Sequence, residues 1–306
     1  MNDKLKKILF IGCNNDQIPY LKELRNKNFY IIGTDMNLSA PGVQYCDKFY
    51  NFSYNDFESL IDIGIKEKFN SYDYVFTASA QFAHLGASTF ANYFKIKYPP
   101  KESISICLDK TKYYNEFLKN GLHIPKTFYI DNNQELISQI NLNGKEKVYY
   151  LKSDFSKNPN YIYKFKGTQL STIKINWERD RYFQNSYILQ EEFEGLHLRL
   201  NIFGSFFTCY PFEISDTIKV DVDEETLIQI ASKFKKLIYS LSIEDWLIKF
   251  DIIVNDSHWV VLDIGLDPPY RMLHEYKALG IDFYKFYINQ YIHKHIDSQH
   301  FHGYIK

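Results

Sequence analysis

The sequence predicts an α/β protein built from two or three packed units, and three observations carry this prediction. Its 306 residues exceed the size at which one hydrophobic core usually stops growing. Between residues 7 and 96, short apolar runs alternate with stretches of helical period. After residue 126, several short strands are joined by polar turns. The pattern of residues 7–96 favours a parallel sheet with crossover helices, and the pattern after residue 126 favours smaller α+β units.

The first unit, residues 1–96, follows the order βαβαβα. The strands are KILFIG, FYIIGTD and YDYVFTA, and the helices are DQIPYLKELRNKN, FESLIDIGIKEKF and HLGASTFANYF. Parallel strands with right-handed crossovers carry helices on both faces, so we predict a Rossmann-like domain. The turn after the first strand, GCNNDQ, has only Gly12 of the glycines that a dinucleotide fingerprint needs. We therefore do not expect NAD to bind there.

Residues 97–125 are predicted to connect this domain to the rest of the chain. The run SISIC is interpreted as the end of a strand, and a helix is predicted from Lys110 to Lys119. Gly121 follows that helix and Pro125 prevents its continuation. Residues 126–194 hold the strands TFYI, KVYYLKS and SYILQEEF, separated by polar turns. This pattern is typical of a small α+β lid.

Residues 195–306 are predicted to form a C-terminal unit. A strand pair turns at Gly204, and a helix extends from Glu224 to Leu241. A second hairpin, WLIKFDIIVN and HWVVLDIGL, turns at Asn255 and Asp256. The run IDFYKFYINQYIHKHI is predicted to be an amphipathic helix that packs on the body.

Composition narrows the class of partner. Lys and Arg number 36 against 37 Asp and Glu, so no global positive field favours nucleic acid or an anionic membrane. The four cysteines form no CxxC pair and no metal-ligand spacing, which fits a reducing cytoplasm. No stretch approaches the roughly 20 apolar residues that cross a bilayer. We expect a cytoplasmic protein that binds small molecules, and a homodimer remains an open alternative.

The second C-terminal hairpin carries the strongest chemical signal. Lys249 and Asp251 are two positions apart on one strand and therefore share a face, and Asp263 on the next strand can lie opposite Asp251. Two converging carboxylates repel unless a cation lies between them, and hard oxygen ligands suit Mg²⁺. Asp267 follows four residues later and could add a third oxygen. The alternative interpretation is a solvated hairpin with scattered charges, but the flanking runs are apolar.

Several segments together resemble the ATP-grasp superfamily over nearly the full length. The N-terminal stretch from GCNNDQ to CDKFY is similar to the domain that precedes the ATP-grasp fold in carbamoyl-phosphate synthetase, biotin carboxylase and PurK-like enzymes. LDKTKYYNEFLKNGLHIPKT resembles the opening segment, and VYYLKSDF resembles the lid strand. SYILQEEFEGLHLRLNIFG is similar to the hinge, and FDII with VLDIG to the metal strands. The resemblance implies an ATP-grasp fold of two α+β subdomains after the Rossmann-like domain.

The resemblance also implies roles for individual residues. Lys110 and Lys152 would bind the ATP phosphates as point charges. Arg199, Lys249 and Arg271 would act on the transferred phosphoryl group or the substrate. The residues implied at the adenine, the ribose and the phosphate loop are Gln190, Glu191, Phe193, His197, Ser153 and Ser156, and the implied metal ligands are Asp251 and Asp263, to which Asp267 would add a third oxygen in place of the missing Asn.

The implied activity is that of a carboxylate–amine or carboxylate–thiol ligase that uses ATP and Mg²⁺, with Mn²⁺ as an alternative metal. It would act through an acyl phosphate on small-molecule substrates. Contacts to these substrates are expected from residues 79–84 and 268–271. The alternatives left open are an ATP-dependent carboxylase, a small-molecule kinase and a non-catalytic nucleotide-binding protein. The last is motivated by a lid loop poor in glycine and by Gly265, which stands where the family has a metal-binding Asn.

Overall fold

The N-terminal part of the chain is a parallel sheet. The computed structural model describes residues 6–153, 162–175, 186–212, 222–255, 258–268, 273–274, 276–277, 280–293 and 303–304. The strands β1 (Lys7–Ile11), β2 (Tyr30–Asp35), β3 (Lys48–Asn51) and β4 (Tyr74–Thr77) pair in the order β3-β2-β1-β4. The helices α1 (Ile18–Asn26), α2 (Phe57–Lys66) and α3 (Ala83–Phe94) connect them. The predicted Rossmann-like pattern is confirmed, and β3 adds a strand that was not predicted.

Alternation along the buried strand β1 explains the two layers of helices. Ile8 and Phe10 belong to a core that includes side chains of α1, whereas Leu9 and Ile11 belong to a core with α2 and α3. Both sets are fully buried. From Ile8 to Ile11 the strand is apolar at every position and is therefore covered on both faces, as parallel sheets require.

The connecting segment is mostly helical from Lys101 to Lys119. The run around SISIC, interpreted above as the end of a strand, lies in helix α4 (Lys101–Leu108). Ser103, Ile104 and Cys107 are buried while Lys101 and Glu102 are exposed, which is a helical and not an alternating pattern. The strand interpretation was wrong because a short apolar run does not by itself distinguish the helical period from the alternation of a strand.

Helix α5 (Lys110–Lys119) has the predicted bounds. Asp109 caps it, because its side chain accepts a hydrogen bond of 3.1 Å from the Lys112 amide. A second sheet follows, made of β5 (Thr127–Ile130), β6 (Val148–Ser153), β7 (Ile162–Lys166) and β8 (Tyr187–Glu191) in the order β5-β8-β6-β7. Helix α6 (Asn133–Asn143) and the short helix η4 (Gly167–Thr172) complete this lid. It has its own small core.

The third sheet has the order β12-β11-β9-β10-β13 and is antiparallel. Its strands are β9 (Leu196–Phe203), β10 (Phe206–Pro211), β11 (Ile248–Asn255), β12 (His258–Gly265) and β13 (Gly303–Tyr304). Helix α7 (Glu224–Ser240) packs through Phe234 on Phe250 of β11. Both predicted hairpins and the predicted helix are confirmed. Within the part of the chain that the structure describes, no helix is long and apolar enough to span a membrane.

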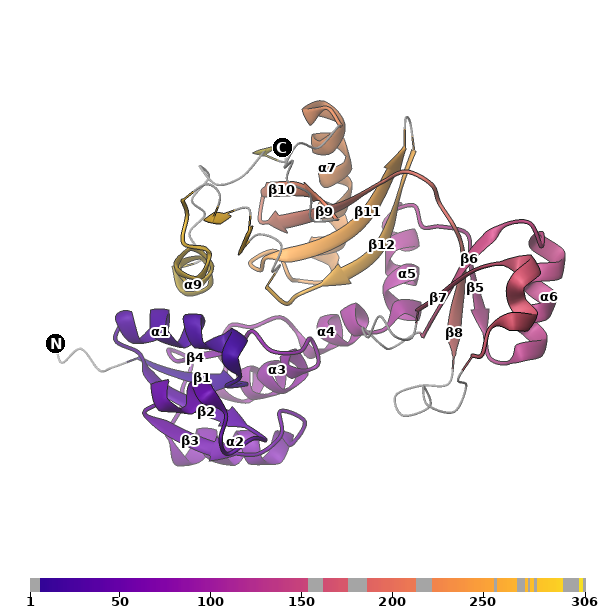
Figure 1. Cartoon of the computed structure of the whole chain (residues 1–306). Coiled ribbons are helices and arrows are strands. Elements are labelled where there is room, and N and C mark those ends of the chain that lie inside the picture. The colour runs from indigo at the N-terminus through magenta and orange to yellow at the C-terminus, as the bar shows by residue number, and fades with distance from the viewer. Residues whose placement is uncertain are drawn as a thin grey trace.

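The terminal helix α9 (Phe283–His293) joins the first and third sheets (Figure 1). It lies beside α1, and its Tyr287 and Tyr291 rings contact Phe76 of β4. The buried Tyr291 hydroxyl also donates a hydrogen bond to the Val75 carbonyl. One apolar core therefore runs from the parallel sheet through α9 to the antiparallel sheet.

Tyr291→Phe is expected to lower the free energy of unfolding by about 1 kcal/mol, because it removes one buried hydrogen bond and leaves the Val75 carbonyl without it. Urea unfolding of the full chain measures the change. Tyr72→Phe is the matched control, because the Tyr72 side chain is exposed. Equal stability of the two variants would show that the Tyr291 hydroxyl adds nothing to this junction.

Candidate active site

Two carboxylates face each other across the β11–β12 hairpin. Asp251 pairs directly with Asp263 in the strand register, so the predicted opposition of these two acids is confirmed. The register then shifts, because Ile252 pairs with Val261 and leaves Leu262 as an extra residue on β12. Such a bulge bends a strand and changes the direction of its neighbouring side chains. The bulge thus lies immediately before the second acid.

Helix α5 holds the bulge in place. The Tyr114 hydroxyl donates a 2.8 Å hydrogen bond to the Leu262 carbonyl, which the bulge frees from the ladder. Burial and the charge of Asp263 raise the pKa of both Tyr113 and Tyr114. Both hydroxyls therefore remain protonated donors beside Asp263. Tyr114 was not singled out in the sequence, although its position four residues after Lys110 places it on the same helix face.

Arg199 neutralises the first acid. Its Nε and Nη2 atoms donate hydrogen bonds of 2.8 and 3.0 Å to the two Asp251 carboxylate oxygens. β9 lies next to β11, and Arg199 is the direct register partner of Asp251. The side chains are 19% and 15% exposed, so the pair is largely screened from water. In the sheet order β12-β11-β9, Asp251 lies between Asp263 and Arg199, so the guanidinium neutralises Asp251 from the side opposite Asp263.

The charge around Arg199 is concentrated. Burial lowers the Arg199 pKa, but the bond with Asp251 and the charges of Asp267 and Asp263 outweigh burial, so the pKa is raised. The three predicted metal acids therefore act together on one guanidinium. They do not converge on one point, because Asp267 is held elsewhere. Among the residues that the structure describes, no three His, Cys, Asp or Glu side chains are placed to share one ion.

Asp267 does not join Asp251 and Asp263. It contacts Lys249 and Gln81 instead. Lys249 Nζ lies 2.5 Å from Asp267 Oδ2, and Gln81 Nε2 donates to Asp267 Oδ1. Burial raises the Asp267 pKa, but Lys249 and Gln81 outweigh burial and lower it, so the carboxylate is ionised. The predicted third metal oxygen is thus engaged by a lysine and an amide. The contact also brings residues 79–84 of the first domain to the metal strands.

The lid lysine, Lys152, is connected through other side chains to β12, the strand that carries Asp263. Lys152 Nζ lies 2.8 Å from Gln190 Oε1 on the neighbouring strand β8. Gln190 is fully buried, and its Oε1 lies 3.4 Å from the Tyr114 hydroxyl oxygen. Its Nε2 donates a 3.0 Å bond to Thr127 Oγ1 on β5. A continuous chain of contacts therefore leads from Lys152 through Gln190 and Tyr114 to the bulge before Asp263.

The other predicted nucleotide residues lie around this chain. Lys110 is the first residue of α5 and is only 5% exposed, so a lysine is buried there, which is rare. The Glu191 amide donates to the Lys126 carbonyl, and its carboxylate pairs with Lys126 and Lys147. The amide on which adenine recognition would depend is thus already bonded within the sheet. Phe193 is half-buried after β8.

His197 lies on β9, two positions before Arg199. The His197 ring stacks on the Phe212 ring with centroids 3.8 Å apart, and the Arg199 guanidinium lies 4.9 Å from the Phe212 ring centroid. Ser153 is buried at the end of β6. Ser156 and Arg271, predicted at the phosphates and at the substrate, lie outside the described residues.

Magnesium chemistry fits the donor set of the acid pair. Mg²⁺ is commonly held by one or two carboxylates together with substrate phosphates and water. Asp251 and Asp263 supply two carboxylates on one sheet face, and Gly265 gives no further side-chain ligand. For Asp251 to bind the ion, it would have to release part of its bond with Arg199. A site of this kind would form with the nucleotide and not before it.

His84 on α3 completes the cluster around Asp267, and the sequence signal for it was only its place in residues 79–84. Its side chain is 3% exposed, and its Nδ1 lies 2.7 Å from the Tyr98 hydroxyl. Its Nε2 is buried with no hydrogen-bond partner among the described residues. Burial lowers the pKa of His84 from 6.5 to about 4; Asp267 opposes this shift and Lys249 strengthens it.

The free energy of unfolding is expected to fall by about 2 kcal/mol between pH 7 and pH 5 because of His84 alone. The pKa of His84 is about 4 in the folded chain against 6.5 for the ordinary group, so the unfolded state binds more protons between these values. Stability is therefore lost as the pH falls through 6.5. His84→Asn should show a correspondingly smaller loss in urea unfolding. The same pH slope in both proteins would contradict a buried neutral imidazole.

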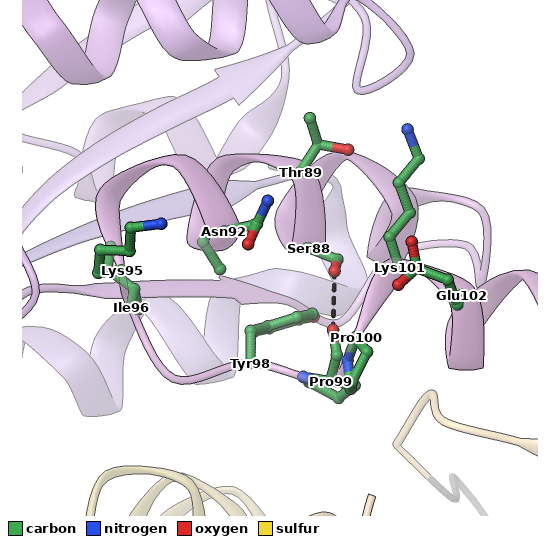
Figure 2. Close-up of a pocket in the computed structure, with 11 residues that line it drawn as sticks. Ser88, Thr89, Asn92, Lys95, Ile96, Tyr98, Pro99, Pro100, Lys101 and Glu102 are labelled. Carbon is green, nitrogen blue, oxygen red and sulfur yellow. Dashed lines mark hydrogen bonds between the residues drawn. The ribbon is translucent and has the colours of Figure 1, made fainter. Parts of the chain in front are cut away.

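A hollow of about 570 Å³ lies near this cluster but does not contain the predicted residues (Figure 2). It is formed by α3 and the segment that leads into α4, where the Ser88 hydroxyl donates to the Pro99 carbonyl. Tyr98 lines the hollow and is its connection to His84. The hollow is therefore distinct from the face that carries the acids and lysines.

Solved structures resemble this fold, whereas no protein-family model and no curated protein matches the sequence. Phosphoribosylglycinamide synthetase from Anaerococcus prevotii matches 95% of this chain and 76% of its own, with a TM-score of 0.69 and 17% identity. L-amino acid ligase from Bacillus licheniformis matches 100% and 78%, with a TM-score of 0.71 and 13% identity. The biotin carboxylase domain of 2-oxoglutarate carboxylase from Hydrogenobacter thermophilus, a dimer with Mg-ADP, matches 98% and 73%, with a TM-score of 0.76 and 11% identity.

These likenesses establish the fold. The chain has the ATP-grasp fold, in which a Rossmann-like domain precedes a lid and a C-terminal antiparallel sheet, as the resemblance of its segments implied. Its arrangement is that of the N5-carboxyaminoimidazole ribonucleotide synthetases, of which the enzyme from Thermotoga maritima matches with a TM-score of 0.70 and 17% identity. At such identities, activity and substrate do not follow from the comparison.

Proposed function

We propose that the chain is an ATP-dependent ligase that joins a small-molecule carboxylate to an amine or a thiol through an acyl phosphate. The observation that carries the proposal is the chain of contacts from Lys152 on the lid to the strand of Asp263. It connects a cation suited to phosphate oxygens with the pair of acids suited to magnesium. The structural neighbours, which include ligases and carboxylases, support the same class.

Two transfers would make up the reaction. A substrate carboxylate oxygen attacks the γ-phosphorus of ATP, the bond to the bridging oxygen breaks, and ADP leaves. The amine or thiol then attacks the acyl carbon, loses its proton, and expels phosphate. Phosphoryl transfer leaves little covalent work to the protein, so Lys152, Arg199 and Lys249 would act by position and charge. Lid closure would exclude the water that hydrolyses an acyl phosphate.

Magnesium would be held by Asp251 and Asp263 and would neutralise the phosphate charge when bound. Arg199 would keep one donor on Asp251 while the other turns to the phosphates, because its two nitrogens bond separate oxygens. Lys249 would stay on Asp267, where Gln81 also bonds. This second ion pair would position the loop at residues 79–81 against the substrate.

Product analysis tests the proposal. The chain is incubated with Mg-ATP and pooled carboxylates and amines after a thermal-shift screen has selected the pools that raise the melting temperature. ADP, phosphate and an amide or thioester are the expected products. A stable phosphorylated product would identify a small-molecule kinase instead. Absence of Mg-ADP and Mg-ATP binding in calorimetry would overturn the proposal in favour of a non-catalytic protein.

An ATP-dependent carboxylase is the second candidate function. It is favoured by the match to the biotin carboxylase domain, whose TM-score of 0.76 exceeds the 0.71 of the L-amino acid ligase. Bicarbonate is itself a carboxylate-like substrate that is activated by the same phosphoryl transfer. Incubation with labelled bicarbonate and Mg-ATP distinguishes the two, because only a carboxylase transfers the label to an acceptor without a second carboxylate.

A further inference from the structure

Two cysteines meet beside the edge of the parallel sheet. Cys13 follows β1, and Cys46 follows the short helix η2 (Pro41–Tyr45) just before β3. The strand β2 lies between β1 and β3. Residues that are 33 positions apart in the sequence are thereby brought to the same strand, and the proposed ligase reaction uses neither of them.

Gly33 of β2 allows the two sulfurs to approach. A Cβ atom added at Gly33 would lie 2.4 Å from Cys46 Sγ and 3.1 Å from Cys13 Sγ. The two sulfur atoms therefore share the space that a larger side chain would fill. The thiols also lie close enough for each to shift the pKa of the other. Both cysteines are present as free thiols.

The backbone of this region is fixed around the thiol pair. The Cys13 amide donates a 2.7 Å hydrogen bond to Asp35 Oδ2, and the Cys13 carbonyl accepts a 2.8 Å bond from the Gly42 amide. Cys46 Sγ lies 3.7 Å from the Gly42 carbonyl. The segments that carry the two thiols are therefore held together at Gly42.

The two thiols differ in access and in acidity. Cys13 is fully buried, whereas Cys46 is half-buried. The neighbouring Cys13 thiol lowers the pKa of Cys46, and Arg25 contributes to this shift, while burial and Asp47 oppose it. Cys46 and burial raise the pKa of Cys13. Cys46 therefore has the character of an attacking thiolate and Cys13 that of a resolving thiol.

We propose that Cys13 and Cys46 form a reversible intramolecular disulfide by exchange with a low-molecular-weight disulfide such as oxidised glutathione. The Cys46 thiolate attacks one sulfur of the glutathione disulfide, forming a mixed disulfide and releasing one glutathione thiolate. The Cys13 thiol loses its proton and attacks Cys46 Sγ, which forms the protein disulfide and releases the second glutathione. The protein loses two electrons and two protons, and the small disulfide gains them.

The disulfide would join η2 to the end of β1, close to the candidate active site. Gly12 precedes Cys13, and a Cβ added at Gly12 would lie 2.8 Å from the Ser79 Cβ. Two residues after Ser79, Gln81 donates to Asp267. The thiol pair thus lies beside the loop that reaches the acids, but its oxidation needs no nucleotide and is independent of the proposed ligase activity.

Thiol counting and peptide mapping on the full chain test the proposal. After incubation with oxidised glutathione, the free thiols counted in denaturant should fall from four to two, and the mass should decrease by about 2 Da. A Cys13–Cys46 linked peptide should appear and disappear on reduction. Cys209→Ser is the matched control, since Cys209 is buried in the third sheet, and the same linked peptide should form in it.

The single variants separate the two steps. Cys13→Ser should stop at a glutathione adduct on Cys46, and Cys46→Ser should lose no thiols. Retention of all four thiols in the wild type, or a wild type that stops at the Cys46 adduct, would overturn the proposal. Both of these outcomes are measured on the unmodified sequence, so they stand even where a variant fails to fold.

Discussion

Arg199→Met is expected to lower the free energy of unfolding by about 3 kcal/mol in metal-free buffer. The substitution keeps the apolar stem but removes the cation that bonds both oxygens of Asp251. Asp251 is then left opposite Asp263 on a largely buried sheet face, where two negative charges repel. Urea unfolding with a chelator present measures the loss.

Magnesium should restore part of that loss. A divalent cation bound by the two acids can supply the positive charge that the substitution removes, so millimolar Mg²⁺ should raise the melting temperature of Arg199→Met more than that of the wild type. Arg25→Met is the control, since the Arg25–Asp47 pair is more exposed and should contribute little. If Mg²⁺ shifts both variants equally, the acid pair is not the metal site.

Lys152→Met is expected to weaken Mg-ATP binding about 10–100-fold, because a hydrogen-bonded charge contact is lost at the phosphates. Lys152 contacts Gln190 from a lid strand whose other face packs in the lid core, so the fold should persist. Calorimetric titration with Mg-ATP gives the dissociation constants.

Lys164→Met provides the matched control for Lys152→Met. Lys164 lies on the neighbouring strand β7 and pairs with Glu192 at the surface. The substitution Lys164→Met removes a positive charge from the same sheet as Lys152→Met does. The Mg-ATP affinity of the Lys164→Met variant should stay within about twofold of the wild type, as for a screened surface charge. Equal weakening by both substitutions would indicate a general charge effect and not a phosphate contact.

The regular elements could be predicted because their patterns are local. Helix α5 has the predicted bounds, since Asp109 caps its start and Gly121, with a φ of 77°, follows its end. The hairpin that brings Asp251 near Asp263 also followed from strand periodicity and one short turn, but the direct pairing of the two acids depends on the bulge at Leu262. Patterns of this kind depend on neighbours along the chain, which the sequence displays directly.

The partners of the site residues could not be predicted in the same way. Asp267 was expected beside the acid pair, but it bonds Gln81, which is 186 positions away. The bulge at Leu262 and its Tyr114 donor likewise depend on how α5 packs on β12. A side chain with several acceptable partners takes the one that tertiary packing brings to it, and periodicity carries no information about that choice. The roles given to the site residues remain predictions, and Ser156 and Arg271 lie outside the described residues.

The shared apolar core has a consequence for how such a protein can change over evolutionary time. Side chains of α9 and the parallel sheet are packed as one body with the antiparallel sheet, whereas the lid keeps most of its apolar side chains in a separate cluster. A recombination that replaced the segment between β5 and β8 would disturb few contacts of that body. The lid can thus vary in sequence while the packing of the other two sheets stays largely unchanged.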